Sequence, residues 1–148
     1  MRALVCEAYG PIENLKIAEV PVPEPKAGEV LVRVGAAGVS FAALLGVQGK
    51  HQNKPSLPYV PGNEMAGHVM KLGPGVSGLA VGQRITTGVN QGAYAEYAVV
   101  PAERLVKIPD GLDARSAAAG ILQGMTAHYL ATGVYPLKQG DTALVKDG

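Results

Sequence analysis

The segment Leu57–Gly73, LPYVPGNEMAGHVMKLG, restricts the fold more than any other part of the chain. Two prolines keep its first half extended, because the proline ring fixes φ and removes a backbone donor. Gly62 permits a sharp reversal, and an apolar, strand-like run follows it. Asn63 and Glu64 are therefore predicted to lie on a tight turn at a sheet edge, where catalytic and ligand-binding groups are often presented. The alternative interpretation is an ordinary turn with a solvated glutamate.

Short apolar segments separated by glycine and proline fill the first hundred residues. The chain contains 20 glycines and 11 prolines among 148 residues, and most of them fall between these segments. Many short strands joined by such turns predict a mainly β fold, either a small barrel or a sandwich. The expected strands span residues 2–9, 15–20, 30–37, 65–72, 83–87, 93–100 and 104–108.

Two segments are predicted to be helical. Residues 40–47 have helical composition, and Ser40, the first of them, is the expected N-cap. Residues 113–132 are rich in alanine, begin at the expected N-cap Asp113 and end before a glycine and a proline. This long helix marks the change from the β region to a different kind of structure.

The end of the chain predicts a second domain. Gly120 and Gly124 lie four residues apart on one face of the long helix, which predicts close packing against another element. The apolar run 142–145 follows the helix as the first strand of a parallel α/β unit would. We therefore expect one domain over residues 1–112 and the start of another over residues 113–148.

Composition excludes several classes of partner. The net charge is +1 with both signs scattered, which argues against nucleic acid or an anionic membrane as the main partner. The single cysteine, Cys6, excludes an intrachain disulfide framework and is expected to be packed, in a reducing compartment. No segment is long and apolar enough to span a bilayer, so a soluble cytoplasmic protein is predicted.

The sequence contains neither a dinucleotide-binding motif in a suitable context nor a zinc-ligand spacing. Residues 73–78 match GxGxxG, but too few residues follow for a helix, and Pro74 removes an amide that a phosphate would need. This segment is interpreted as a turn between strands. The three histidines and the cysteine match no zinc-ligand spacing. Ser40 has no nucleophile-elbow context, so no hydrolytic site is predicted.

Six blocks follow one another along the chain: AAGVSFAALLGVQGKH, LPYVPGNEMAGHVMKLGPGV, VGQRI, GAYAEYAVVP, LVKIPDGLD and AAAGILQGMTAHYL. In this order they resemble the medium-chain dehydrogenase/reductase superfamily. Within it the chain most resembles the zinc-independent quinone oxidoreductases, the zeta-crystallin-like group. The resemblance implies a GroES-like, partly open β-barrel with short helices as substrate domain, followed by one helix and the first strand of a dinucleotide-binding Rossmann domain.

Two departures from the zinc alcohol dehydrogenases of this superfamily imply a reaction without zinc. Ser40 stands where those enzymes have a cysteine ligand, and Asn63 stands where they have a histidine ligand. The four-cysteine structural lobe before the GAYAEY strand is also missing. A quinone or enone is already electrophilic and accepts hydride without a Lewis acid. The resemblance therefore implies hydride transfer from NADPH to a quinone or conjugated carbonyl.

The resemblance also implies residues that bind the cofactor. Ser40, Phe41 and Leu45 are expected at the nicotinamide end of the cleft, and the hydroxyl of Thr126 is expected to hold the carboxamide. Each has a structural alternative. Phe41 and Leu45 would then be helix core, Ser40 only a cap, and Thr126 a helix residue bonded to its own backbone.

Three further residues are expected near the substrate. Asn63 is positioned to hydrogen-bond the substrate oxygen or a bound water. His51 stands where the family often has a tyrosine, and it adds a titratable group. Tyr59 is near enough in sequence to supply the missing phenol. Glu64 is interpreted as a structural carboxylate behind the site, and Ala43 replaces a common aspartate.

Alternative functions remain open at this level. An enone or enoyl-thioester reductase would use the same scaffold, since acceptor choice depends on the shape of the cleft. A binding or structural module without catalysis is the alternative from another class. The preference for NADPH over NADH and the acceptor are not predicted. The exposed face of the long helix is a possible homo-oligomer surface.

The last residues generate a prediction about activity. In the family a glycine-rich phosphate loop follows the strand that corresponds to residues 142–145, whereas this chain ends at Gly148. We therefore expect part of a longer enzyme that does not bind NADPH tightly by itself, because the pyrophosphate site is missing. The purified 148-residue chain should show no NADPH-dependent quinone reduction in a spectrophotometric assay. Measurable turnover would contradict this expectation.

Overall fold

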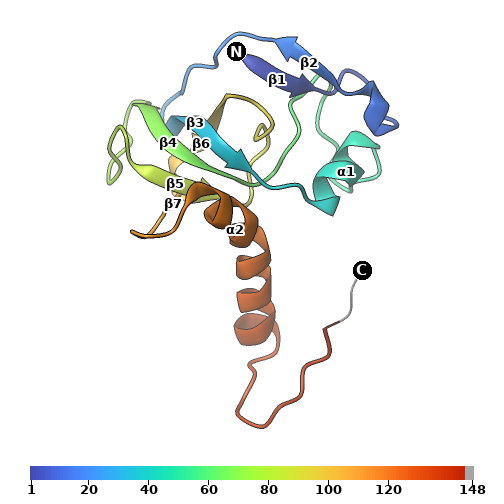
Figure 1. Ribbon diagram of the computed structural model, residues 1–148, viewed down its shortest axis with the longest axis vertical. Helices are drawn as coiled ribbons and strands as arrows, with labels where there is room; N and C mark the ends of the chain where they lie inside the picture. Colours follow the sequence, from blue (N-terminus) through green and yellow to red (C-terminus); the bar gives the residue numbers. More distant parts are fainter. Residues whose placement is uncertain (146–148) are drawn as a thin grey trace.

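The computed structural model describes residues 1–145, and its core is an antiparallel sheet (Figure 1). Five strands follow the order β6-β3-β4-β5-β7, and a separate hairpin-like pair, β1 and β2, lies beside them. The mainly β fold predicted from the sequence is confirmed. The strands are β1 (Arg2–Val5), β2 (Lys16–Glu19), β3 (Glu29–Ala37), β4 (Met65–Leu72), β5 (Arg84–Thr87), β6 (Tyr97–Pro101) and β7 (Val106–Lys107).

Alternating apolar residues place the core on one face of the central strands. Burying each valine, isoleucine or methionine side chain of the cluster contributes about 1.5–3 kcal/mol, so this cluster is a main source of stability. Isolated bridges between Ala3 and Ala95 and between Cys6 and Tyr59 attach the β1–β2 pair to the rest. Cys6 is buried and free, as predicted. The core cluster contains Val30, Val32, Met65, Val69, Ile85, Ala93, Ala98 and Val100.

Two capped helices follow the sequence prediction. In α1 (Phe41–Val47) the Ser40 Oγ accepts a hydrogen bond from the Ala43 N–H at 3.3 Å. In α2 (Ala114–Tyr129) the Asp113 carboxylate accepts from the Arg115 N–H at 2.8 Å and from Ser116. These bonds lower the pKa of Asp113. Short helical turns complete the elements: η1 (Ile12–Asn14), η2 (Ala102–Arg104) and η3 (Leu130–Val134), which is π-helical.

The two halves of α2 have different surroundings. Its first turns pack on the sheet through Ala117 and Ala118, which form a second buried cluster with Ala66 and Ile108. Its second half stands away from the sheet, and the chain after it turns back toward the barrel (Figure 1). Among residues 1–145 no helix is both long and apolar enough to cross a membrane.

The strand predicted at residues 142–145 does not form, so this part of the prediction was wrong. These residues have no regular structure, and Leu144 and Val145 are 92% and 88% exposed. A strand needs a neighbour for its backbone groups, and no strand of the described residues lies beside this segment. Residues 146–148, which the sequence analysis assigned to the same second domain, lie outside the described residues.

The predicted close packing at Gly120 and Gly124 was also wrong. A Cβ built on either glycine meets nothing within 4 Å, because the exposed side of the helix carries both. The close approach occurs instead at Gly88, where a Cβ would lie 3.1 Å from the Leu122 Cα. The sheet therefore contacts α2 through a glycine of the barrel and not through a glycine of the helix.

A glycine inside β4 tests the close pairing of the central strands. A Cβ at Gly67 would overlap the carbonyl oxygen of Arg33, which belongs to the neighbouring backbone and cannot move aside. Gly67→Ala is expected to lower the free energy of unfolding by at least about 2 kcal/mol. The matched control is Gly35→Ala, because its Cβ meets the Ala66 carbonyl oxygen at an ordinary 3.5 Å. Urea denaturation measures the free energy of unfolding of both variants. An equal loss in Gly67→Ala and Gly35→Ala would contradict the predicted overlap.

Candidate functional site

A groove opens between the start of α1, the exposed half of α2 and the segment 130–145 that follows α2. Its volume is about 1080 Å³, close to the upper end of the usual size range of ligand pockets. The wall is mostly apolar, with contributions from Phe41, Leu122 and Leu130. Ser40, Gln123 and Thr126 are among its few polar side chains. A mostly apolar wall with a few polar groups is typical of small-molecule sites.

The structure brings most of the predicted cofactor residues together in this groove. Ser40, Phe41 and Thr126 all line it, although Thr126 is far from the others in the sequence. Phe41 is 72% exposed, so the alternative of a helix-core residue is wrong for it. Leu45 is half-buried on α1 and does not line the groove.

The two hydroxyls in the groove each keep one free hydrogen-bonding site, a donor on Ser40 and an acceptor on Thr126. Ser40 Oγ accepts from the Ala43 N–H, so its own O–H remains a donor. Thr126 donates its O–H to the Leu122 carbonyl at 2.9 Å, so its oxygen retains an acceptor site. The capping and backbone-bonding alternatives are thus real contacts. They leave one donor and one acceptor, the pair of groups that a primary amide needs.

The predicted substrate residues line a different, smaller cavity. His51, Tyr59 and Asn63 surround about 40 Å³, enough for a water molecule. Ala42 lines both this cavity and the groove, so the first turn of α1 lies between them. Burial raises the pKa of Tyr59 to about 12, and within residues 1–145 its hydroxyl has no hydrogen-bond partner. Tyr59 is therefore a neutral phenol with an unused donor.

Glu64 is fully buried, so the interpretation as a solvated turn residue was wrong. Its relative exposure is 0%, and burial raises the pKa of its carboxyl group. Its main-chain oxygen accepts from the Gly38 N–H at 3.1 Å. With the Gln123 amide oriented to satisfy its neighbours, Nε2 donates to Glu64 Oε2 at 3.2 Å and to the Ala119 carbonyl at 2.9 Å. Glu64 thus lies behind the groove and contacts α2.

Gln123 is a groove residue that the sequence analysis missed. The only sequence signal was its polarity in an otherwise apolar helical run, three residues before Thr126. Its partner Glu64 is distant in sequence, and no local pattern links the two. The contact depends on how α2 packs on the barrel.

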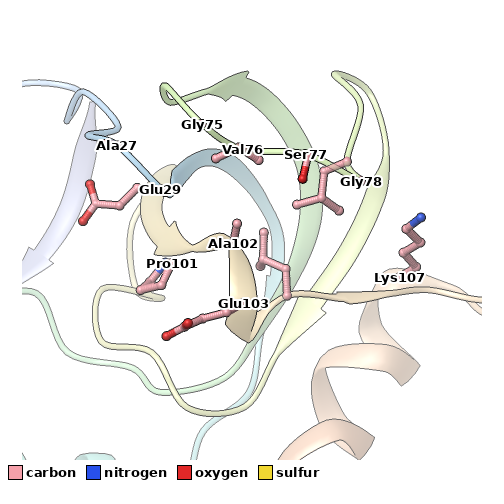
Figure 2. A pocket seen from close by; sticks show the side chains of 13 residues that line it. Ala27, Glu29, Gly75, Val76, Ser77, Gly78, Pro101, Ala102, Glu103 and Lys107 are labelled. Atoms are coloured by element: carbon pink, nitrogen blue, oxygen red, sulfur yellow. The ribbon is translucent and has the colours of Figure 1, made fainter.

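The remaining motifs lie away from the groove. The GxGxxG segment forms a turn after β4 and no helix opens there, so its interpretation as a turn is confirmed. With the turn at Ala102 and Glu103 it borders a separate hollow (Figure 2). His68 is exposed on β4, opposite Arg33 and Arg84. No cluster of three or more histidine, cysteine or acidic side chains suited to a metal occurs in the described part of the chain.

A family model decides where the chain belongs. The model of the alcohol dehydrogenase GroES-like domain matches residues 26–110, more than half of the chain. This chain belongs to the medium-chain dehydrogenase/reductase superfamily. The matched range contains α1, the turn before β4 and the whole central sheet, and it ends just before α2. One wall of the groove thus comes from the GroES-like domain, and the rest comes from α2 and from residues 130–145 after it.

Individual relatives in the superfamily carry different names. The human synaptic vesicle membrane protein VAT-1 homolog-like is 38% identical over 145 residues, which are 98% of this chain and 35% of that protein. The Escherichia coli quinone oxidoreductase, solved in complex with NADPH, has a TM-score of 0.89 and 29% identity, covering 93% of this chain and 42% of that one. A 2-haloacrylate reductase has a TM-score of 0.82 and 36% identity, covering 95% and 42%. The chain therefore spans well under half the length of these relatives.

The burial of Glu64 predicts a pH-dependent stability. Because its folded pKa is raised above the ordinary 4.5, the folded chain holds this proton more tightly than the unfolded chain. Its contribution to the free energy of unfolding is therefore present below pH 4.5 and is lost as the pH rises through the folded pKa. We expect the stability of Glu64→Gln relative to wild type to increase over that range in urea denaturation. The exposed Glu103→Gln is the control, and a flat profile for Glu64→Gln would refute the prediction.

Proposed function

We propose that this chain supplies the substrate domain and part of the nicotinamide pocket of an NADPH-dependent oxidoreductase. In this proposal the enzyme transfers hydride to a quinone or another conjugated carbonyl without zinc. Residues 1–112 act as the GroES-like substrate domain, and residues 113–148 begin the dinucleotide-binding domain. The observation that carries the proposal is the groove in which Ser40, Phe41 and Thr126 meet. The quinone oxidoreductase that resembles the chain and binds NADPH supports it.

The groove suits the nicotinamide end of the cofactor. A nicotinamide ring is flat and apolar and carries a primary carboxamide. The free O–H of Ser40 donates a hydrogen bond to the carboxamide oxygen. The Thr126 Oγ1 accepts a hydrogen bond from the carboxamide N–H. Phe41 and Leu122 cover the ring and exclude water. When bound, NADPH supplies the hydride.

The small cavity is large enough only for a water molecule, so its residues act on the acceptor oxygen through a bound water. Hydride addition to a quinone or enone places negative charge on that oxygen, which then takes up a proton. With a pKa of about 12, Tyr59 keeps its proton and stabilises the charge by donating a hydrogen bond to this bound water. Asn63 supplies a second donor, its side-chain amide, and His51 lines the same cavity as a further polar group.

The proposal needs no zinc because the acceptor is already activated by conjugation. Ser40 and Asn63, which stand at the zinc-ligand positions of the alcohol dehydrogenases, carry a hydroxyl and an amide. Neither group is a usual zinc ligand. The free, buried thiol of Cys6 is the basis for proposing a reducing, cytoplasmic location.

A second acceptor class is supported by one relative. The 2-haloacrylate reductase named above acts, by its name, on a conjugated acid and not on a quinone. An enone or enoyl-thioester reductase is therefore the second candidate. A panel of quinones, enones and enoyl thioesters, assayed with the natural protein that contains this chain, separates the two.

Thr126 tests the proposed cofactor contact. Thr126→Val removes the acceptor for the carboxamide, so KM for NADPH is expected to rise about five- to tenfold, the worth of one hydrogen bond. The matched control is Thr132→Val, because the Thr132 hydroxyl also donates to a helix carbonyl, that of His128 at 2.7 Å, but lies outside the groove. Steady-state kinetics on the natural protein containing the chain measure both. Equal KM values for the two variants would exclude the assigned role of Thr126.

A further inference from the structure

We propose that Glu64 is the positioning residue of the groove, because its main chain holds the wall formed by α1 and its side chain holds the wall formed by α2. This inference rests on the proposed function in assigning the groove to a cofactor. The two contacts themselves are properties of the fold.

The main chain of Glu64 holds the wall formed by α1. Its carbonyl oxygen accepts from the Gly38 N–H, two residues before Ser40. The Gly38 carbonyl in turn accepts from the Tyr94 hydroxyl at 3.1 Å. Both backbone polar groups of Gly38 are thus hydrogen-bonded. These two bonds fix the backbone just before Ser40 and so position Ser40 at the start of α1.

The side chain of Glu64 holds the wall formed by α2. Its Oε2 accepts from the Gln123 amide, which also bonds the Ala119 carbonyl of the same helix. Thr126 lies one turn further along α2, and both Gln123 and Thr126 line the groove. The carboxylate therefore fixes the rotation of α2 at the turn that presents the proposed carboxamide contact.

The carboxyl group packs directly against Gly38. A Cβ on Gly38 would lie 2.5 Å from the Glu64 Cδ and Oε1, so the absence of a side chain at this glycine leaves the space that the carboxyl group occupies. Oε1 has no hydrogen-bond partner within residues 1–145. A buried oxygen without a partner destabilises the fold, so filling space does not account for the acid. The bond to Gln123 is the contact that an apolar side chain of similar size would not make.

Backbone hydrogen exchange of the chain tests the positioning role without any cofactor. Glu64→Leu and Gln123→Leu each remove the bond, and amide exchange over residues 122–129 is expected to accelerate about tenfold in each. The double variant should be no faster than either single variant. The matched control is Thr87→Val, which removes a buried hydroxyl that also lacks a partner but does not line the groove. Because Gln123 is exposed, Gln123→Leu still tests the loss of the bond even if Glu64→Leu fails to fold.

A kinetic measurement separates positioning from general stability. In the natural protein containing the chain, Glu64→Leu and Gln123→Leu should raise KM for NADPH about fivefold, whereas Glu64→Gln, which keeps an acceptor oxygen, should stay near wild type. Unchanged exchange in both single variants, or additive effects in the double variant, would overturn the inference. If the wild-type protein shows no NADPH turnover but the exchange result holds, the proposed function fails while Glu64 still positions the walls of the groove.

Discussion

The pairing of β3 with β4 determines where the other elements lie. The two strands are in register from Val30 opposite Leu72 to Ala37 opposite Met65, with two bulges. β6 pairs with the free side of β3, and β5 pairs with the free side of β4. The chain leaves β3 toward α1 and reaches β4 through the proline-glycine turn, so both site-bearing segments adjoin the same end of the strand pair. The groove and the small cavity are consequences of this arrangement.

Elements whose signals are local could be predicted from the sequence. The strand at residues 65–72 was predicted with its observed bounds, because glycines and alternating apolar residues mark it. The Ser40 and Asp113 caps were predicted for the same reason, since a cap bonds its own first turn. The predicted strand at residues 142–145 failed because a strand also requires a partner, which its own residues do not reveal. The contact expected at Gly120 and Gly124 failed because spacing alone does not say which face of a helix is buried.

The candidate site was less accessible to sequence reasoning than the fold. Ser40, Phe41 and Thr126 were selected by resemblance to a family, and the structure places them in one groove. The separation of Tyr59 and Asn63 into a second cavity was not predictable, because it depends on where α1 lies. The contact between Glu64 and Gln123 was missed because it joins two elements that pack only in the folded chain.

The one-sided support of α2 has a mechanical consequence. The helix has 16 residues and is about 24 Å long, but its buried residues, Ala117 and Ala118, lie in its first turns. The contact with Gly88 reaches Leu122, and the helix from there to Tyr129 extends about 10 Å, so a tilt of about 5° at this contact would displace the far end by about 1 Å. Small adjustments near Gly88 and Leu122 would thus be amplified into changes in aperture at the opposite end of the helix.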